Sequence, residues 1–263
     1  MNFLCCTGPD LTNSILLPAV LMLTAPFVGS FVGVLIMRLP SDRPVVFGRS
    51  YCETCDHAIS IGDMVPLVSA ICLKFRCRYC RTEIDHVRAF AEITALVIAI
   101  WAASVTSGWL LVMSCMLGWL LLALAIIDWR FFLLPNVLTI SLLTTGFVAT
   151  SMLNPGTLVD HFIGAIVGFV LLAGLGSLYR LFRARDGLGL GDAKLLGAIG
   201  AWVSLDSVPS VLVLAAVTGL IVALGLSVRS REFELTMKVP FGTCLAAAGW
   251  LVWLYGPLNF GQI

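Results

Sequence analysis

Two aspartates stand beside apolar segments, where carboxylates are rare. Asp128 follows the apolar run 109–127, and Asp192 closes the glycine-rich stretch 186–192. Taken singly, each could be an interfacial carboxylate or a helix cap, but intramembrane carboxylates usually mark a functional path. Two carboxyls at one site do not readily both ionise, so one keeps a proton while the other acts as a base. The pair therefore predicts an aspartyl hydrolase that splits an amide with water.

The glycine-rich stretch predicts how Asp192 is held. Gly189 and Gly191 permit a sharp turn and close packing, and Asp192 stands at the expected N-cap of the next helix. The run 193–205 has 13 residues, which rise about 20 Å against a bilayer core of about 30 Å. The loop is therefore expected to dip into the membrane, lining a protein-enclosed site. Lys194 is expected either to hold a substrate or the Asp192 charge, or to be a plain interfacial lysine.

Four cysteines form a second candidate site. Cys52-x-x-Cys55 is followed, after 21 residues, by Cys77-x-x-Cys80. Two such pairs can bring four thiolates to one tetrahedral zinc ion. The polar segment 38–88 that carries them is too short to bury much core unaided, so the metal is predicted to be structural.

Composition identifies the class of protein. Hydrophobic residues make up 59% and charged residues 12%, against about 25% charged in soluble domains, and the mean hydropathy is +1.01. A multi-pass membrane protein is predicted, which excludes an ordinary soluble enzyme. Eight apolar runs are expected to form transmembrane helices: 15–37, 89–105, 109–127, 137–153, 162–182, 193–205, 208–228 and 239–255.

Basic residues predict the topology. The polar segment 38–88 holds eight of the sixteen Lys and Arg residues, and alternate connections hold the rest. The positive-inside rule then places this segment in the cytoplasm and both termini outside. We expect an all-α polytopic protein of about eight helices, divided into a first helix (1–37), an inserted cytoplasmic zinc-binding module (38–88) and a seven-helix catalytic membrane domain (89–263).

Other polar residues beside the apolar runs are weaker candidates. Glu92, near the start of the second helix, is a candidate lining residue on the same side as the aspartates, with snorkelling to the interface as the alternative. Asp160 and His161 begin the fifth helix on the opposite side, and we assign them no role beyond capping.

In their order along the chain, the motifs resemble the type IV prepilin peptidase family. The resemblance covers most of the chain and rests on the stretch 29–40, the paired cysteines around 63–69, Asp128 with Leu134-Pro135, Gly189-x-Gly191-Asp192 with Lys194, and Pro240-Phe241-Gly242.

The resemblance implies a polytopic aspartyl endopeptidase of the bacterial inner membrane. Asp128 and Asp192 would be catalytic, Gly189, Gly191 and Lys194 would form the active-site loop, and Pro240, Phe241 and Gly242 would line the site. Such enzymes remove the basic leader of prepilins and pseudopilins at the cytoplasmic face, for pili or type II secretion. Members with the cysteines commonly also methylate the new N-terminus, using S-adenosyl-methionine.

Four positions depart from the usual family pattern. Gly33 and Met64 replace asparagine, Glu53 stands where proline is common, and Asn136 stands where aspartate is frequent. The departures leave the peptidase assignment intact and bear mainly on the methyltransferase, whose determinants are expected in the first cytoplasmic module.

Two rival interpretations remain at this point. A presenilin-type aspartyl protease shares the glycine–aspartate motif, but the cysteine module and Pro240-Phe241-Gly242, in place of proline-alanine-leucine, argue against it. The other rival is an ion-coupled transporter with buried carboxylates and a zinc regulatory loop. Transporters usually place the site near the midplane and show two related halves, and we find no internal repeat in this sequence.

Overall fold

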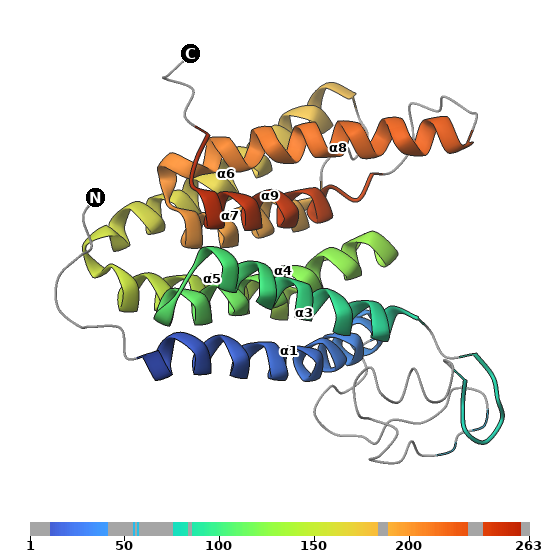
Figure 1. The fold of residues 1–263 in the computed structure, drawn as a ribbon. Helices are drawn as coiled ribbons and strands as arrows, with labels where there is room; N and C mark the ends of the chain where they lie inside the picture. Colours follow the sequence, from blue (N-terminus) through green and yellow to red (C-terminus); the bar gives the residue numbers. More distant parts are fainter. Residues whose placement is uncertain are drawn as a thin grey trace. The chain divides into compact units, whose positions relative to one another are not determined.

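The computed structural model describes residues 11–41, 55, 57, 76–83, 86–183, 189–230 and 239–258. These residues form eight α-helices (Figure 1): α1 Leu11–Arg38, α3 Val87–Val105, α4 Gly108–Phe131, α5 Asn136–Leu153, α6 Leu158–Arg183, α7 Leu190–Val203, α8 Val208–Ser230 and α9 Phe241–Tyr255. Short 3-10 helices lie at Leu39–Ser41, Pro155–Thr157 and Leu205–Ser207. Each predicted apolar run corresponds to one helix, so the all-α prediction is confirmed for the described part of the chain.

Six stretches are long and apolar enough to cross a membrane. They are Ile15–Arg38, Val87–Val105, Gly108–Phe131, Asn136–Leu153, Pro155–Phe182 and Leu205–Val228. The other two described helices are shorter, with 14 residues in α7 and 15 in α9, or about 21 Å and 23 Å of rise. The prediction of about eight spans is thus supported for six, and the expected short sixth helix is confirmed. The orientation of the termini stays a prediction.

Packing divides the described residues into two compact units. The first unit comprises the described residues of Met1–Phe31 and Arg49–Met116. The second unit comprises the described residues of Val32–Gly48 and Leu117–Ile263. The second unit contains both aspartates and the helices α5 to α9, so the candidate active site lies within this unit.

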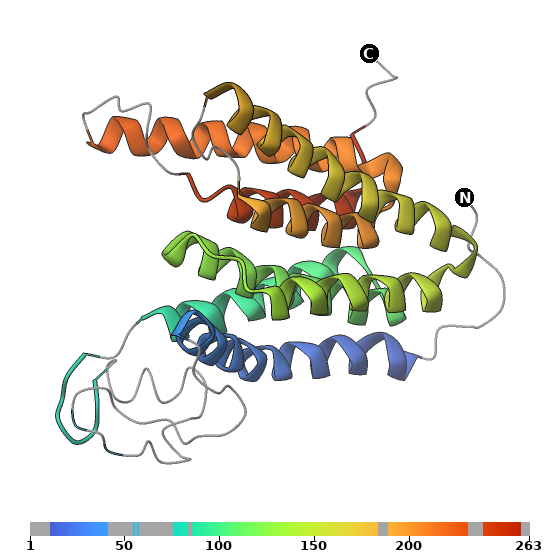
Figure 2. The same ribbon diagram turned by 180° about the vertical axis from the view of Figure 1, so that it is seen from behind.

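The short helix α7 lies at the centre of the second unit. It packs against α5, α6, α8 and α9, and every residue from Leu195 to Val203 is buried. Figure 2 shows α6 running alongside α7 when the molecule is seen from behind. Close approach of these two helices depends on small residues, because a Cβ on Gly168 would lie 2.9 Å from the Leu196 carbonyl oxygen and one on Gly200 would overlap the Gly164 backbone.

Candidate active site

Asp128 lies in the last turn of α4, and its side chain is only 5% exposed. The backbone N–H of Thr243, in the first turn of α9, donates to Asp128 Oδ2 at 2.7 Å, and Thr243 Oγ1 lies 3.2 Å from the same oxygen. The first amides of a helix have no partner within it and carry partial positive charge. The carboxyl of Asp128 therefore meets the N-terminal end of another helix.

Gly242 lies directly against the Asp128 carboxyl. A Cβ added to Gly242 would lie 2.9 Å from both Asp128 Cγ and Oδ2, and 3.1 Å from Leu134 Cδ1. Real Cβ atoms do not approach other atoms so closely, so any side chain at this position would displace the carboxyl. The predicted lining role of Gly242 thus has a geometric basis in this close contact.

Asp192 lies in the first turn of α7, whose N-cap is Gly189 in an extended conformation (φ −75°, ψ 142°). The Asp192 N–H donates to the Gly189 carbonyl at 3.1 Å. The expectation that Asp192 is itself the N-cap is therefore wrong, because the chain leaves the extended conformation at Gly189, three residues earlier. Asp192 still lies among the unpaired amides of the first turn.

The segments that carry the two aspartates share a neighbour. Asp128 and Asp192 are 64 positions apart in sequence, yet Gly242, which lies against the Asp128 carboxyl, and Gly191, which directly precedes Asp192, both face the Leu134 side chain.

Leu134 links the three segments of this site. A Cβ on Gly191 would lie 3.3 Å from Leu134 Cβ and Cδ1, and Leu134 Cδ1 also faces Gly242. The chain reaches Leu134 through Phe132, which adopts a left-handed conformation (φ 52°) while its N–H bonds to the Asp128 carbonyl at 2.9 Å. Such a conformation is uncommon for a residue other than glycine. It turns the chain sharply after α4, so that Leu134 lies between the two glycines.

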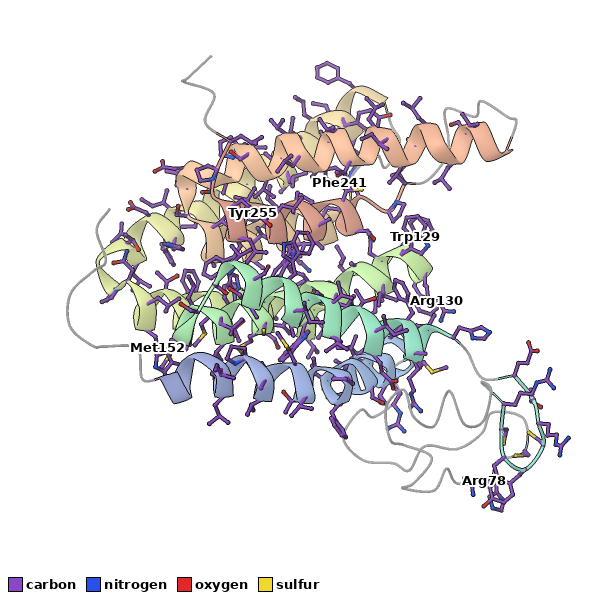
Figure 3. All side chains as sticks on the ribbon, in the orientation of Figure 1. Arg78, Trp129, Arg130, Met152, Phe241 and Tyr255 are labelled. Carbon is purple, nitrogen blue, oxygen red and sulfur yellow. The ribbon has the colours of Figure 1, made fainter. Side chains whose placement is uncertain are left out.

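Three other predicted loop and lining residues lie near the starts of α7 and α9. Lys194 Nζ donates to Asn136 Oδ1 at 2.9 Å, which ties the start of α7 to the start of α5. Pro240 is buried as the N-cap of α9. Figure 3 shows Phe241 at the start of that helix and Tyr255 at its other end. One predicted alternative was that Lys194 holds the Asp192 charge, whereas the structure gives Lys194 a different partner, Asn136.

Glu92 lies in the first unit and is only 3% exposed, so its side chain does not reach toward solvent. Helix α1 approaches it very closely, because a Cβ on Gly29 would lie 2.5 Å from Glu92 Cα. The predicted role of Glu92 in lining the site stays a prediction.

Three of the four predicted metal ligands gather in one cluster. The Sγ atoms of Cys55, Cys77 and Cys80 all lie within 4.8 Å of one another, with 4.0 Å between Cys55 and Cys77. Tetrahedral zinc with Zn–S bonds of about 2.3 Å needs sulfur atoms about 3.8 Å apart, so the cluster fits that ion with little movement. Cys52, the fourth predicted ligand, lies outside the described residues.

The turn around Cys77 and Cys80 suits a metal-binding thiolate. Cys77 N–H donates to the Thr82 carbonyl at 2.9 Å, and Arg81 N–H donates back to the Cys77 carbonyl at 3.0 Å. Hydrogen bonds from the side chain and the backbone of Thr82 lower the pKa of the exposed Cys80 thiol to about 6. A thiolate is the form that binds metal.

Sequence reasoning missed Thr243. The signal available was a threonine directly after Pro240-Phe241-Gly242, within the first turn of an otherwise apolar helix. A hydroxyl at that point suggests a polar partner, but nothing in the sequence identifies Asp128 as that partner.

Comparison with known proteins identifies the family. Residues 115–224 match the Type IV leader peptidase family, and residues 23–106 match the Bacterial Peptidase A24 N-terminal domain. The prepilin leader peptidase/N-methyltransferase of Aeromonas salmonicida (strain A449) is 34% identical over 87% of both chains. The protein of that name from Burkholderia pseudomallei (strain 1026b) is 34% identical, over 83% of this chain and 71% of its own. The one from Pseudomonas aeruginosa is 31% identical over 87% of both. No solved structure matches the chain. The chain therefore belongs to the type IV leader peptidase family.

Proposed function

We propose that this protein is a membrane endopeptidase that removes the leader peptide from type IV prepilins or pseudopilins. The relatives that cover most of the chain carry the name prepilin leader peptidase/N-methyltransferase. The observation that supports the proposal is that Leu134 faces both Gly242, which lies against the Asp128 carboxyl, and Gly191, which directly precedes Asp192. The membership of the chain in a peptidase family gives no support to the transporter alternative.

In the proposed mechanism Asp128 and Asp192 share the proton transfers of amide hydrolysis. The ionised member takes a proton from a water molecule, whose oxygen attacks the scissile carbonyl carbon. The protonated member donates to the carbonyl oxygen as the tetrahedral intermediate forms. When the C–N bond breaks, the carboxyl that took the water proton gives it to the amine nitrogen. The other carboxylate takes a proton from a hydroxyl of the intermediate, so both carboxyls return to their starting state.

The surrounding residues have supporting roles in this proposal. Gly242 and Gly191 leave room for the carboxyls and for Leu134, while Gly189 starts the turn that carries Asp192. The substrate carries a basic leader, in keeping with the family, and the cleaved bond lies at the cytoplasmic face of a bacterial inner membrane.

Replacing each aspartate by asparagine tests the peptidase. Asp128→Asn and Asp192→Asn, co-expressed with a prepilin, should leave its leader in place while membrane insertion is unchanged. Asp160→Asn is the matched control, because Asp160 lies in the first turn of α6 and is exposed. If either of the first two variants removed the leader at a rate near that of the wild type, the two-aspartate mechanism would be wrong.

A structural zinc ion is the second proposal, held by Cys55, Cys77 and Cys80 with Cys52 as the fourth ligand. The clustering of three Sγ atoms supports it, and the ion would stabilise the small module 38–88. Purified protein should contain near-stoichiometric zinc, and the double variant Cys52→Ser/Cys55→Ser should lose it. Cys115→Ala, at a buried cysteine of α4, should retain the metal.

Methylation of the new N-terminus is the third proposal, supported by the names of the relatives. When bound, S-adenosyl-methionine would supply the methyl group. Mass spectrometry of the processed pilin, made with the wild-type enzyme, should find the mass of one added methylene at the N-terminal residue. An unmodified N-terminus in the presence of S-adenosyl-methionine would contradict the proposal.

The proposed topology has both termini outside the cytoplasm, the module 38–88 inside, and the membrane domain in 89–263. Reporter fusions after Arg88, Arg185 and Arg231 should read as cytoplasmic, and fusions after Gly156 and Ser207 as external. A cytoplasmic C-terminus would break the eight-helix arrangement.

A further inference from the structure

Thr243 contacts Asp128 through two different atoms. Its N–H donates to Asp128 Oδ2 at 2.7 Å, and its Oγ1 lies 3.2 Å from the same oxygen. The same Oγ1 lies 2.9 Å from the carbonyl oxygen of Ala125, one turn earlier in α4. The N–H belongs to the backbone of α9, so it is fixed, whereas the hydroxyl hydrogen can rotate.

The hydroxyl of Thr243 has one hydrogen and two acceptors within reach. It can donate either to Asp128 Oδ2 or to the Ala125 carbonyl. When Asp128 is ionised, its oxygen only accepts, so the hydroxyl donates to it. When Asp128 is protonated, the carboxyl O–H can donate to Thr243 Oγ1, and the threonine hydrogen then turns to Ala125. Both states keep the heavy atoms in place.

The Ala125 carbonyl can gain or lose the hydrogen bond from Thr243 without being left unpaired. Ala125 lies four residues before Trp129 inside α4, so its oxygen also accepts the regular helix hydrogen bond. A carbonyl oxygen has two lone pairs, and it stays satisfied whether or not Thr243 donates to it. An unpaired buried acceptor, which would disfavour one of the two states, is thereby avoided.

We propose that Thr243 is a positioning residue for catalysis, whose hydroxyl changes hydrogen-bond partner as Asp128 gains and loses its proton. This inference rests on the proposed aspartyl peptidase function. Within it, the N–H of Thr243 fixes the direction of the carboxyl, and the hydroxyl supports both protonation states that the reaction cycle requires. Thr243 itself does not exchange a proton with the substrate.

Substitution of Thr243 by valine tests the role of the hydroxyl. Valine keeps the shape, the β-branch and the backbone N–H, and it removes only the O–H. With detergent-solubilised full-length enzyme and a purified prepilin, Thr243→Val should lower kcat by about tenfold to hundredfold, the effect of one hydrogen bond to an ionised group. KM should change by less than about twofold, because the contact acts on Asp128 rather than on bound substrate.

Serine is the rescue variant, because Thr243→Ser restores the hydroxyl without the methyl group. It should return kcat to within about threefold of the wild type. Thr144→Val is the matched control: the Thr144 hydroxyl donates to a helix carbonyl, that of Ile140 within its own helix α5 at 3.0 Å, and it lies at an exposed position. This control should cleave as the wild type does, and all variants should unfold within a few degrees of the wild type.

The outcomes distinguish failure of the proposed peptidase function from failure of the proposed role of Thr243. If the wild type leaves the leader uncut, the proposed function fails and the role of Thr243 fails with it. If the wild type cleaves and Thr243→Val matches its kcat, only the role of Thr243 is overturned. Equal impairment of the valine and serine variants would also overturn it, because the methyl group and not the hydroxyl would then matter.

Discussion

The two ends of α7 are held in different ways. At its C-terminal end, His161 Nδ1 of α6 donates to the Ala201 carbonyl at 3.0 Å, and the Thr150 hydroxyl of α5 donates to the same oxygen at 3.4 Å. Trp202 Nε1 donates to the Leu142 carbonyl at 2.8 Å. At its N-terminal end, Asp192 is partly exposed, and the link to a neighbouring helix is the exposed bond from Lys194 to Asn136.

The side-chain packing at the two ends of α7 differs in the same way as the hydrogen bonds do. Trp202 is buried against α5, where a Cβ on Gly146 would lie 2.8 Å from its Cδ1, and it meets the Trp253 ring of α9 edge-on with 5.3 Å between centroids. Leu190, at the other end, is exposed. The difference teaches how a helix too short to span the membrane can hold a reacting group in place. One end is fixed by packing and buried hydrogen bonds, and the other carries Asp192, to which the proposed mechanism assigns a reacting carboxyl.

This comparison predicts that substitutions near the carboxyls impair cleavage without unfolding the protein, and the largest effect is expected at Gly242. Gly242→Ala places a Cβ 2.9 Å from Asp128 Cγ, so the carboxyl must shift. A displacement of about 1 Å can cost about a hundredfold in rate, and we expect kcat to fall by at least that factor with little change in thermal stability.

The control for this variant is Gly225→Ala in α8, where a Cβ would meet nothing within 4 Å. It should cleave as the wild type does. Cleavage by Gly242→Ala at more than a tenth of the wild-type rate would show that Asp128 is not held as the structure describes.

At the anchored end, Gly200→Ala should reduce stability more than chemistry. The new Cβ would overlap the Gly164 backbone of α6, and overpacking typically costs about 1–3 kcal/mol. We expect a lower free energy of unfolding in detergent, with kcat of the folded fraction within a few-fold of the wild type. Gly174→Ala in α6, where a Cβ would meet nothing within 4 Å, should leave stability unchanged. If Gly200→Ala lowered kcat as much as Gly242→Ala or more, the proposed difference between the two ends of α7 would be wrong.

Sequence reasoning predicts the helices, and the place of each aspartate beside an apolar run, because these signals are local. The bilayer thickness sets the length of apolar runs, and Gly189 and Gly191 mark the turn before Asp192. The short length of the run 193–205 already indicated that this helix differs from the others. All of these signals can be recognised within one segment of the chain.

The remaining features depend on contacts between distant segments. Thr243 meets Asp128 across 115 positions, and Trp202 meets Leu142 across 60. Sequence analysis assigned His161 no role beyond capping, whereas the structure gives it a hydrogen bond to Ala201, 40 positions away. A single sequence does not indicate which turns of two apolar helices face each other, and that register decides all three contacts.

A smaller effect is expected from removing one anchoring bond. Trp202→Phe keeps most of the ring but loses the N–H that donates to Leu142. Hydrogen bonds between membrane helices contribute about 0.6 kcal/mol on average and about 1.7 at most, so the free energy of unfolding should fall by an amount in this range. Cleavage should stay close to that of the wild type. Trp109→Phe, at an exposed tryptophan of α4, should change neither quantity, and a stability loss as large as that of Trp202→Phe would contradict the assignment of the anchor.

The smallest effect is expected at the N-terminal link. Asn136→Asp replaces the amide oxygen that accepts from Lys194 Nζ at 2.9 Å with a carboxylate oxygen. The pair is exposed, so the new ion pair should contribute only about 0–1 kcal/mol, and salt should reduce it. Thermal unfolding in detergent should show a slight gain in stability at low salt that disappears at high salt. Cleavage should remain within about twofold of the wild type, because a carboxylate still accepts from Lys194 and the bond lies at the edge of the site. A tenfold loss of cleavage would show instead that the N-terminal end of α7 depends on the Asn136 amide group as a hydrogen-bond donor, and that this end is as constrained as the other.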